Sequence, residues 1–263
     1  MKTLPGVVIA GLLLHAALLV PHAKGADAPA PSRYEQAKSR TATIYEANSG
    51  QKRVLYKFKR STTQSGSTLK VVREFNYPDG KIAARESMEY EGDQLVSYDL
   101  EELQINAHGT AKLQRVSKAL PKGQIAFAYI TTTGSSTKTN ADTEPLVHDT
   151  LVGDMIGPFL VAHWDDLIKG KTVKCRYIAA SRAETVGFEF EKQSETTRQG
   201  KPVVIIKMSP SSLIISALVD PLYFTMEKDG EHRCLQYDGR TTPKIRDGNK
   251  WKDLDAETVF DWE

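Results

Sequence analysis

Residues 69–90 read LKVVREFNYPDGKIAARESMEY, and this stretch predicts the fold. Apolar and polar side chains alternate on both sides of Pro78-Asp79-Gly80, as in two antiparallel strands joined by a tight turn. A two-residue Asp79-Gly80 loop fixes which residues face one another. The predicted facing pairs are Arg73 with Glu86, Phe75 with Ala84, Val71 with Met88, and Tyr77 with Ile82. The stretch is therefore predicted to be a β-hairpin with one mainly apolar face.

The same alternation recurs along most of the chain. It predicts further strands near residues 54–58, from 95, near 110, and at 125–131, 172–178, 185–192, 202–208, 222–228 and 232–238. The polar run at 131–145 is predicted to be a break between strands. Strands that follow one another without intervening helices exclude a Rossmann-like parallel sheet. The expected fold class is mainly β, an antiparallel curved sheet or incomplete β-barrel of meander type.

One interval, at about 146–169, has helical periodicity instead. Its apolar stripe consists of Leu151, Val152, Met155, Ile156, Phe159, Leu160, Trp164, Leu167 and Ile168. Lys169-Gly170 is a helix stop. Proline inside a helix is unfavourable but is accepted in its first turn. We therefore expect two helices joined near Gly157, the second starting at Pro158, with Gly157 and Pro158 as a hinge. This two-part helix is central to the sheet or caps it.

The apolar face of the hairpin carries charges. If Gly92-Asp93 turns the next hairpin, Glu86 faces Asp99 and Ala84 faces Glu101, which gives a row with Arg73. Charges on an apolar face must be paired or hydrated. The row is a polar anchor in a binding groove, a structural ion pair, or is broken by a bulge near Leu100 that turns the acids to solvent. The candidate ligand-binding residues are Arg73, Phe75, Tyr77, Glu86, Met88, Tyr90, Asp99, Met155 and Phe159.

The N-terminus has the order of a secretory signal: Lys2, an apolar run at 7–20, then small residues. Cleavage is expected after Gly25, leaving a proline-rich tether at 26–39 and a single β-rich domain at 40–263. A retained anchor is the alternative, although the run is shorter than the roughly 20 residues that span a bilayer. Loss of Lys2 and Lys24 makes the chain formally neutral, and no basic stripe points to nucleic acid. We expect a periplasmic or secreted protein without a transmembrane segment after processing.

Motifs for common chemistry are missing from the sequence. There is no G-x-S-x-G elbow, H-E-x-x-H helix or C-x-x-C pair. The histidines after the signal do not cluster, and His163 fits a buried position better than a catalytic one. No catalytic residue, metal or cofactor is predicted. A disulfide between Cys175 and Cys234 stays open, since export favours it but strand parity points the two side chains to opposite faces.

Four short motifs resemble an uncharacterised family of exported bacterial proteins. They are WDDLIKGK at 164–171, SRAETVGF at 181–188, VDPL at 219–222 and YDGR at 237–240, within about residues 145–263. The predicted architecture of that family is similar to the periplasmic lipoprotein carriers LolA and LolB, which bind acyl chains in an open barrel. The resemblance implies a binding or carrier protein for an apolar or amphipathic ligand. The alternatives are an envelope structural or interaction protein with a filled core, and an enzyme that uses the carboxylate row.

Overall fold

The computed structural model describes residues 41–116, 123–217 and 219–262. The predicted signal peptide (1–25) and tether (26–39) lie outside the described residues. No helix in the described ranges has the length and apolar character needed to cross a membrane.

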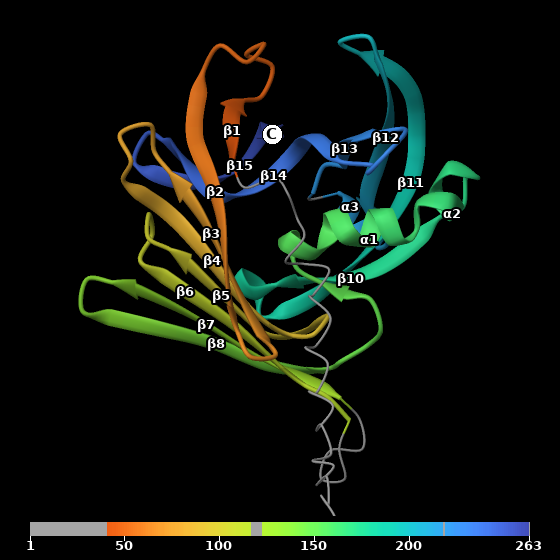
Figure 1. The fold of residues 1–263 in the computed structure, drawn as a ribbon. Coiled ribbons are helices and arrows are strands. Elements are labelled where there is room, and N and C mark those ends of the chain that lie inside the picture. Colours follow the sequence, from red (N-terminus) through yellow and green to blue (C-terminus); the bar gives the residue numbers. More distant parts are fainter. Residues whose placement is uncertain (1–40, 117–122, 218, 263) are drawn as a thin grey trace, which may run out of the picture.

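Fifteen strands of the described residues form one sheet (Figure 1). They are β1 (Thr41–Glu46), β2 (Val54–Ser65), β3 (Thr68–Asn76), β4 (Ile82–Glu91), β5 (Gln94–Glu102), β6 (Ala107–Gln114), β7 (Gln124–Thr133), β8 (Ser136–Pro145), β9 (Thr150–Leu151), β10 (Val173–Ala179), β11 (Glu184–Arg198), β12 (Lys201–Pro210), β13 (Leu222–Glu227), β14 (Cys234–Asp247) and β15 (Lys250–Asp261). The order runs from β8 back to β1, then β15 back to β9. All neighbours are antiparallel except β9 and β10. The first and last strands are therefore partners in the middle of the sheet.

The sheet curls until its two ends meet, but they are joined by side chains and not by a backbone ladder. Glu144 of β8 accepts a hydrogen bond from the Thr185 amide of β11 at 3.1 Å. Gly109 of β6 lies against the short helix η2 (Ala180–Arg182), where an added Cβ would be 3.1 Å from the Cβ of Ala180. The prediction of a mainly β, antiparallel curved sheet is confirmed, and the sheet is not closed into a barrel.

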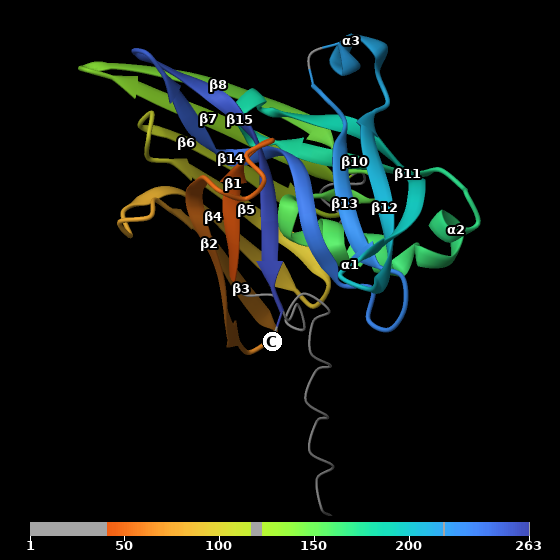
Figure 2. The same cartoon turned by 90° about the horizontal axis from the view of Figure 1, so that it is seen from above.

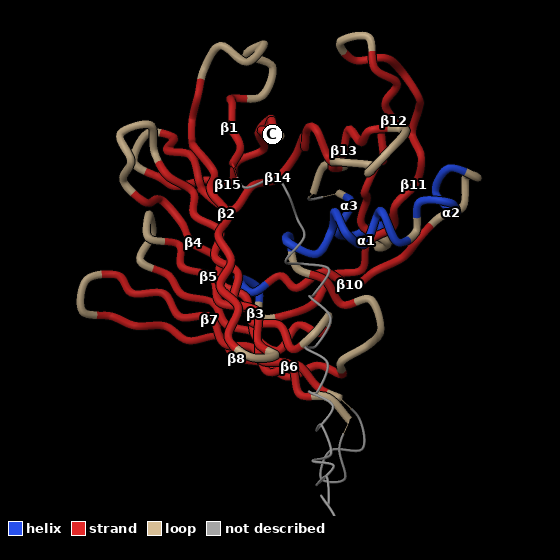
Figure 3. Tube along the Cα trace, viewed as in Figure 1, coloured by secondary structure: helices blue, strands red, loops and turns tan. Residues whose placement is uncertain are grey.

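A helical segment starts inside the curl of the sheet and ends at its edge, beside β11 (Figure 3). It comprises η1 (Gly153–Met155), α1 (Ile156–Ala162) and α2 (Trp164–Ile168). Its buried side chains pack with those of β3–β7 and β10–β13 in one large core. Leu160, Leu167 and Phe190 are fully buried there, and each such side chain stabilises the fold by about 1.5–3 kcal/mol. A smaller core lies under β1–β4 and β15.

The break in the helix does not fall where the sequence predicted it. Gly157 and Pro158 lie in the first turn of α1, where Pro158 replaces an amide that has no partner within the helix. The interruption is at His163, whose φ of −107° and ψ of 16° separate α1 from α2. The two helices are therefore joined at His163 and not near Gly157, so the predicted position of the junction is wrong. The expected stop is confirmed, since Gly170 has a φ of 81° and its amide donates to Leu167.

Some strands escaped prediction. The polar run at 131–145, expected to be a break, continues β7 and forms β8, a strand exposed on both faces. Such a strand has no apolar alternation to reveal it. The terminal strands β1 and β15 and the short helix α3 (Leu213–Ser216) were also missed; Figure 2 shows α3 at the tip of the β12–β13 connection.

In the first hairpin the predicted pairs away from the turn are confirmed, but the turn has three residues instead of two, since the Tyr77 amide donates to Lys81. In the second hairpin the predicted register is wrong. Arg73 pairs with Glu86, Phe75 with Ala84 and Val71 with Met88, but a bulge after Phe75 places Asn76, not Tyr77, opposite Ile82. In the second hairpin a bulge at Val96 shifts the pairing by one residue, so that Glu86 faces Leu100 and Ser87 faces Asp99. A shift of one residue moves a side chain to the other face. Asp99 and Glu101 therefore leave the apolar face, and the carboxylate row does not form.

The two cysteines are free. Cys175 lies on β10 and Cys234 on β14, with β11, β12 and β13 between them in the sheet. Adjacent strands are about 4.8 Å apart, so the two sulfurs are too far from each other to form a disulfide. Burial raises the pKa of each thiol to about 12.

Candidate functional site

A cavity of about 720 Å³ lies between the N-terminal half of the helical segment and the inner face of the sheet. Its walls come from β1–β4 on one side and from β13–β15 on the other, with η1 and α1 above. The volume is in the range of pockets that hold one small ligand. The curl of the sheet thus leaves a space that the helix does not fill.

Apolar and aromatic side chains form most of the cavity wall. They include Ile44, Phe58, Phe75, Ile156, Pro158, Tyr177, Phe224, Met226, Tyr237, Phe260 and Trp262. Val161, Ala162 and Glu231 line the cavity and are exposed, so they mark its mouth. The mouth lies between the end of α1 and the turn after β13. Such walls suit an apolar chain.

Four charged residues on this wall, Arg60, Arg73, Glu86 and Asp154, form what we call the buried charge cluster. The Arg60 guanidinium of β2 binds the Asp154 carboxylate of η1 through two bonds, of 2.7 and 3.0 Å. Both side chains are only 4% exposed. The Tyr90 hydroxyl also donates to Asp154, at 3.2 Å. This pair fixes the start of the helical segment to the sheet.

Arg73 is held differently. Its Nη1 lies 2.8 Å from Oε2 of Glu86, in an ion pair that leaves this oxygen without a well-aligned hydrogen bond. The guanidinium lies over the rings of Phe58 and Phe75, at 5.2 and 5.7 Å from their centroids, positions that favour a cation. Its side chain is 16% exposed. Both arginines line the cavity, but Arg73 is the more exposed of the two.

Two features of the chain make room for this arrangement. A Cβ on Gly153 would lie 2.4 Å from Nη1 of Arg73, so only glycine allows the guanidinium to lie against η1. In β14, a bulge between Thr241 and Lys244 inserts Thr242 and Pro243. The Thr242 hydroxyl donates to Oε1 of Glu86. The bulge thus adds a hydrogen bond to a buried carboxylate.

Burial and charge act together on Arg73 and on two tyrosines that interact with it electrostatically, Tyr98 and Tyr177. Burial opposes the charge of Arg73, but the carboxylates of Glu86 and Asp154 outweigh it and raise the pKa of Arg73. The pKa values of Tyr98 and Tyr177 are raised by burial and then by the charge of Glu86. Arg73 is therefore a permanent cation beside two phenols that stay protonated.

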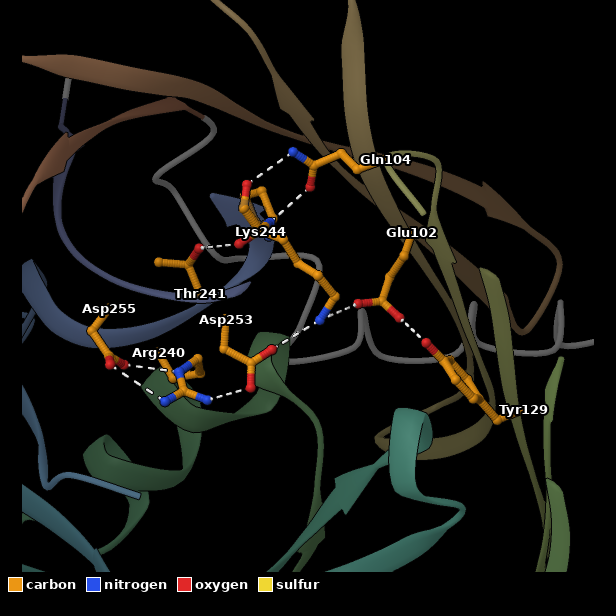
Figure 4. A network of polar contacts seen from close by, with 9 residues as sticks. Glu102, Gln104, Tyr129, Arg240, Thr241, Lys244, Asp253 and Asp255 are labelled. Carbon is orange, nitrogen blue, oxygen red and sulfur yellow. Dashed lines mark hydrogen bonds and ion pairs between the residues drawn. The ribbon is translucent and has the colours of Figure 1, made fainter. Parts of the chain in front are cut away.

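The same bulge supports a second polar group, shown in Figure 4. We call it the β14 network; it consists of Glu102, Gln104, Tyr129, Arg240, Lys244, Asp253 and Asp255. Lys244 Nζ lies 3.0 Å from Glu102 and 2.9 Å from Asp253. Gln104 exchanges two hydrogen bonds with the Lys244 backbone, and Tyr129 donates to Glu102. The network joins β5 and β7 to β14 and β15, which are remote in the sheet order.

Of the predicted site residues, the structure brings Arg73, Phe75, Glu86, Gly157 and Pro158 to the cavity wall. The others lie elsewhere. Met88, Tyr90, Met155 and Phe159 are buried in the large core, Tyr77 accepts a hydrogen bond from Gln104, and Asp99 contacts His108 on the outer face. The hypothesis of a filled core does not describe this sheet, since the cavity remains.

Sequence reasoning missed Arg60, Asp154 and the side chains of β13–β15. Arg60 had a signal, because it continues the alternation of Tyr56 and Phe58 on β2. Asp154 had none, since its partner is 94 residues away. Among the described residues, no group of three or more His, Cys, Asp or Glu side chains could hold a metal ion.

No protein-family model and no curated protein sequence matches the chain. Among solved structures, the chain is similar to a β-barrel-like protein of a domain of unknown function, DUF1849, from Brucella abortus. The TM-score is 0.36 and the sequence identity 9%, over 86% of this chain and 97% of the Brucella chain.

Proposed function

We propose that this protein is a binding or carrier protein for an apolar or amphipathic ligand such as an acyl chain, and that it acts in the periplasm after cleavage near Gly25. The observation that carries the proposal is the cavity of about 720 Å³, whose mostly apolar wall includes the buried charge cluster. Ligand sites are commonly mostly apolar with few polar groups. The signal-like N-terminus supports the location.

Binding in this cavity would bury the apolar part of the ligand against Phe58, Phe75 and Phe224. Each methylene removed from water contributes about 0.8 kcal/mol. Arg73 would orient the polar end. The exposed rim at Val161 and Ala162 gives the ligand a route in without unfolding of the sheet.

The test starts with gently purified protein, which is extracted with organic solvent and analysed by mass spectrometry for bound lipids. Fluorescent acyl probes are then titrated into the extracted protein. Ala162→Trp fills the mouth from an exposed position and should abolish uptake while thermal unfolding stays unchanged. Asp165→Trp, on the exposed side of α2 and away from the cavity, is the matched control. Absence of both an extracted and an added ligand would overturn the proposal and leave an interaction protein as the alternative.

A further inference from the structure

Every arginine among the described residues of the cavity wall has a carboxylate partner. The buried charge cluster contains two arginines and two carboxylates, so its formal charge is zero. The remaining arginines of the wall are also paired: Arg233 with Glu227 at 2.7 Å, and Arg240 with Asp253 and Asp255. Each of the four arginines in the described lining thus already faces a carboxylate. An incoming anion would meet no unbalanced positive charge here.

Hydrogen-bond donors, in contrast, are in excess at one point. A guanidinium has five N–H groups. Among the described residues, Glu86 is the one group in ion-pair contact with that of Arg73. The partial exposure of Arg73 within the cavity lining leaves its other N–H groups available to an acceptor on a ligand. Arg60 does not offer donors in this way, because two of its N–H groups are fixed by Asp154 and its side chain is only 4% exposed.

We infer that the cavity selects ligands whose polar end is an uncharged hydrogen-bond acceptor, such as the ester or amide carbonyl of an acyl chain, over the same chain ending in a free carboxylate. The inference rests on the proposed function and specifies its ligand. A carbonyl oxygen accepts from Arg73 while the Arg73–Glu86 pair stays intact. A carboxylate would compete with Glu86 for one guanidinium and leave net negative charge in a buried site, which is costly.

The experiment compares three ligands that differ only at the polar end: dodecanoate, its methyl ester and its amide. Each displaces a bound neutral acyl probe from the full, processed protein at about pH 8, where a carboxylic acid is ionised. The ester and the amide should bind at least about tenfold more tightly than dodecanoate. The preference for the ester should narrow as the pH is lowered towards the pKa of the acid, while ester and amide binding stays constant.

A charge variant tests the cause. Glu86→Gln removes one negative charge, which gives the cluster a net charge of +1 and should strengthen dodecanoate binding by about tenfold relative to the ester. Glu89→Gln is the matched control, since Glu89 lies on the same strand in an exposed pair with Lys70; its selectivity should equal that of the parent. The pH series on the parent protein gives the same answer if Glu86→Gln does not fold.

The outcomes separate the two proposals. Dodecanoate binding as tightly as the ester, or selectivity unchanged in a folded Glu86→Gln variant, would overturn this inference and leave the carrier function standing. Failure of all three ligands and of the probe would overturn both.

Discussion

The buried charge cluster and the β14 network contain the same kinds of side chain and meet at one bulge, but they differ in how completely their charged groups are paired. In the β14 network the Lys244 ammonium has two carboxylates, and Glu102 has both Lys244 and Tyr129. In the cluster, Arg60 and Asp154 are as fully matched, but Arg73 has one ion-pair partner among the described residues and faces a cavity. At this bulge, Thr242 contacts Glu86 of the cluster and Lys244 contacts Glu102 of the network.

The two groups therefore have different roles: the β14 network stabilises the fold, and the buried charge cluster can also contact a ligand. The β14 network crosses the curl of the sheet from β5 to β14, and its central residues Glu102, Lys244 and Asp253 do not line the cavity. The cluster fixes the helical segment through Arg60 and leaves Arg73 for another partner. A polar group whose donors are all taken stabilises a structure, whereas one with donors directed into an apolar space is suited to recognise a ligand.

The largest expected effect is loss of the Arg60–Asp154 pair. Arg60→Ala leaves the Asp154 carboxylate buried without its guanidinium, so the free energy of unfolding should fall by about 3–5 kcal/mol. Urea denaturation followed by tryptophan fluorescence measures it. Lys70→Ala, which breaks the exposed pair with Glu89, is the control and should change the value by less than about 1 kcal/mol. Equal effects of the two variants would show that Arg60 is not buried in solution.

The second effect separates stability from binding within the cluster. Arg73→Ala strands the buried Glu86 and should lower the free energy of unfolding by about 3 kcal/mol. The double change Arg73→Met with Glu86→Leu removes both charges and should recover most of that loss. The double variant should bind the methyl ester of dodecanoate no more tightly than an alkane of equal length. A single-variant loss below about 0.5 kcal/mol would place the pair in water.

The third effect is on the β14 network. Lys244→Met removes one partner of the buried Glu102 but leaves the Tyr129 hydroxyl, so the free energy of unfolding should fall by about 2 kcal/mol. Uptake of the acyl probe should not change, because Lys244 is outside the cavity wall. Loss of uptake in a folded Lys244→Met protein would show that the two regions are not separable.

How far the sequence predicts this protein depends on distance along the chain. The Arg73–Glu86 pair was predicted correctly, but the turn alone does not set it: Tyr77 pairs with Lys81 across a three-residue turn, and a bulge at Ala83 restores the expected register. Asp99 was misplaced since one extra residue, Val96, turns every later side chain of β5 to the other face. Local patterns do not reveal such a bulge.

Contacts between distant segments could not be predicted from the sequence. Arg60 finds Asp154, and Glu86 finds Thr242, only because the sheet curls and β1 pairs with β15. The β8 strand was missed for a different reason: it is exposed on both faces and has no apolar period. The fold class can be predicted from the repeated hairpins. The contacts of the cluster that join distant segments cannot, because they form only when the sheet curls.

The smallest expected effect is a pH dependence in the β14 network that acts through Asp253. Burial works against its charge, but Lys244 and Arg240 outweigh it and hold the pKa of Asp253 below its ordinary 3.8. A carboxyl whose pKa is lowered by folding contributes stability above its unfolded pKa and loses it as the pH falls through the folded pKa. This contribution is therefore complete above about pH 4 and fades below it. Because the Asp253 side chain is 56% exposed, we expect its contribution to the free energy of unfolding to be less than about 1 kcal/mol.

Asp253→Asn should be less stable than the parent at neutral pH, and the two denaturation midpoints should converge as the pH falls to about 3. Asp165→Asn, at an exposed site on α2, should follow the parent throughout. A constant difference between the parent and Asp253→Asn across this range would show that the charge of Asp253 does not support the network.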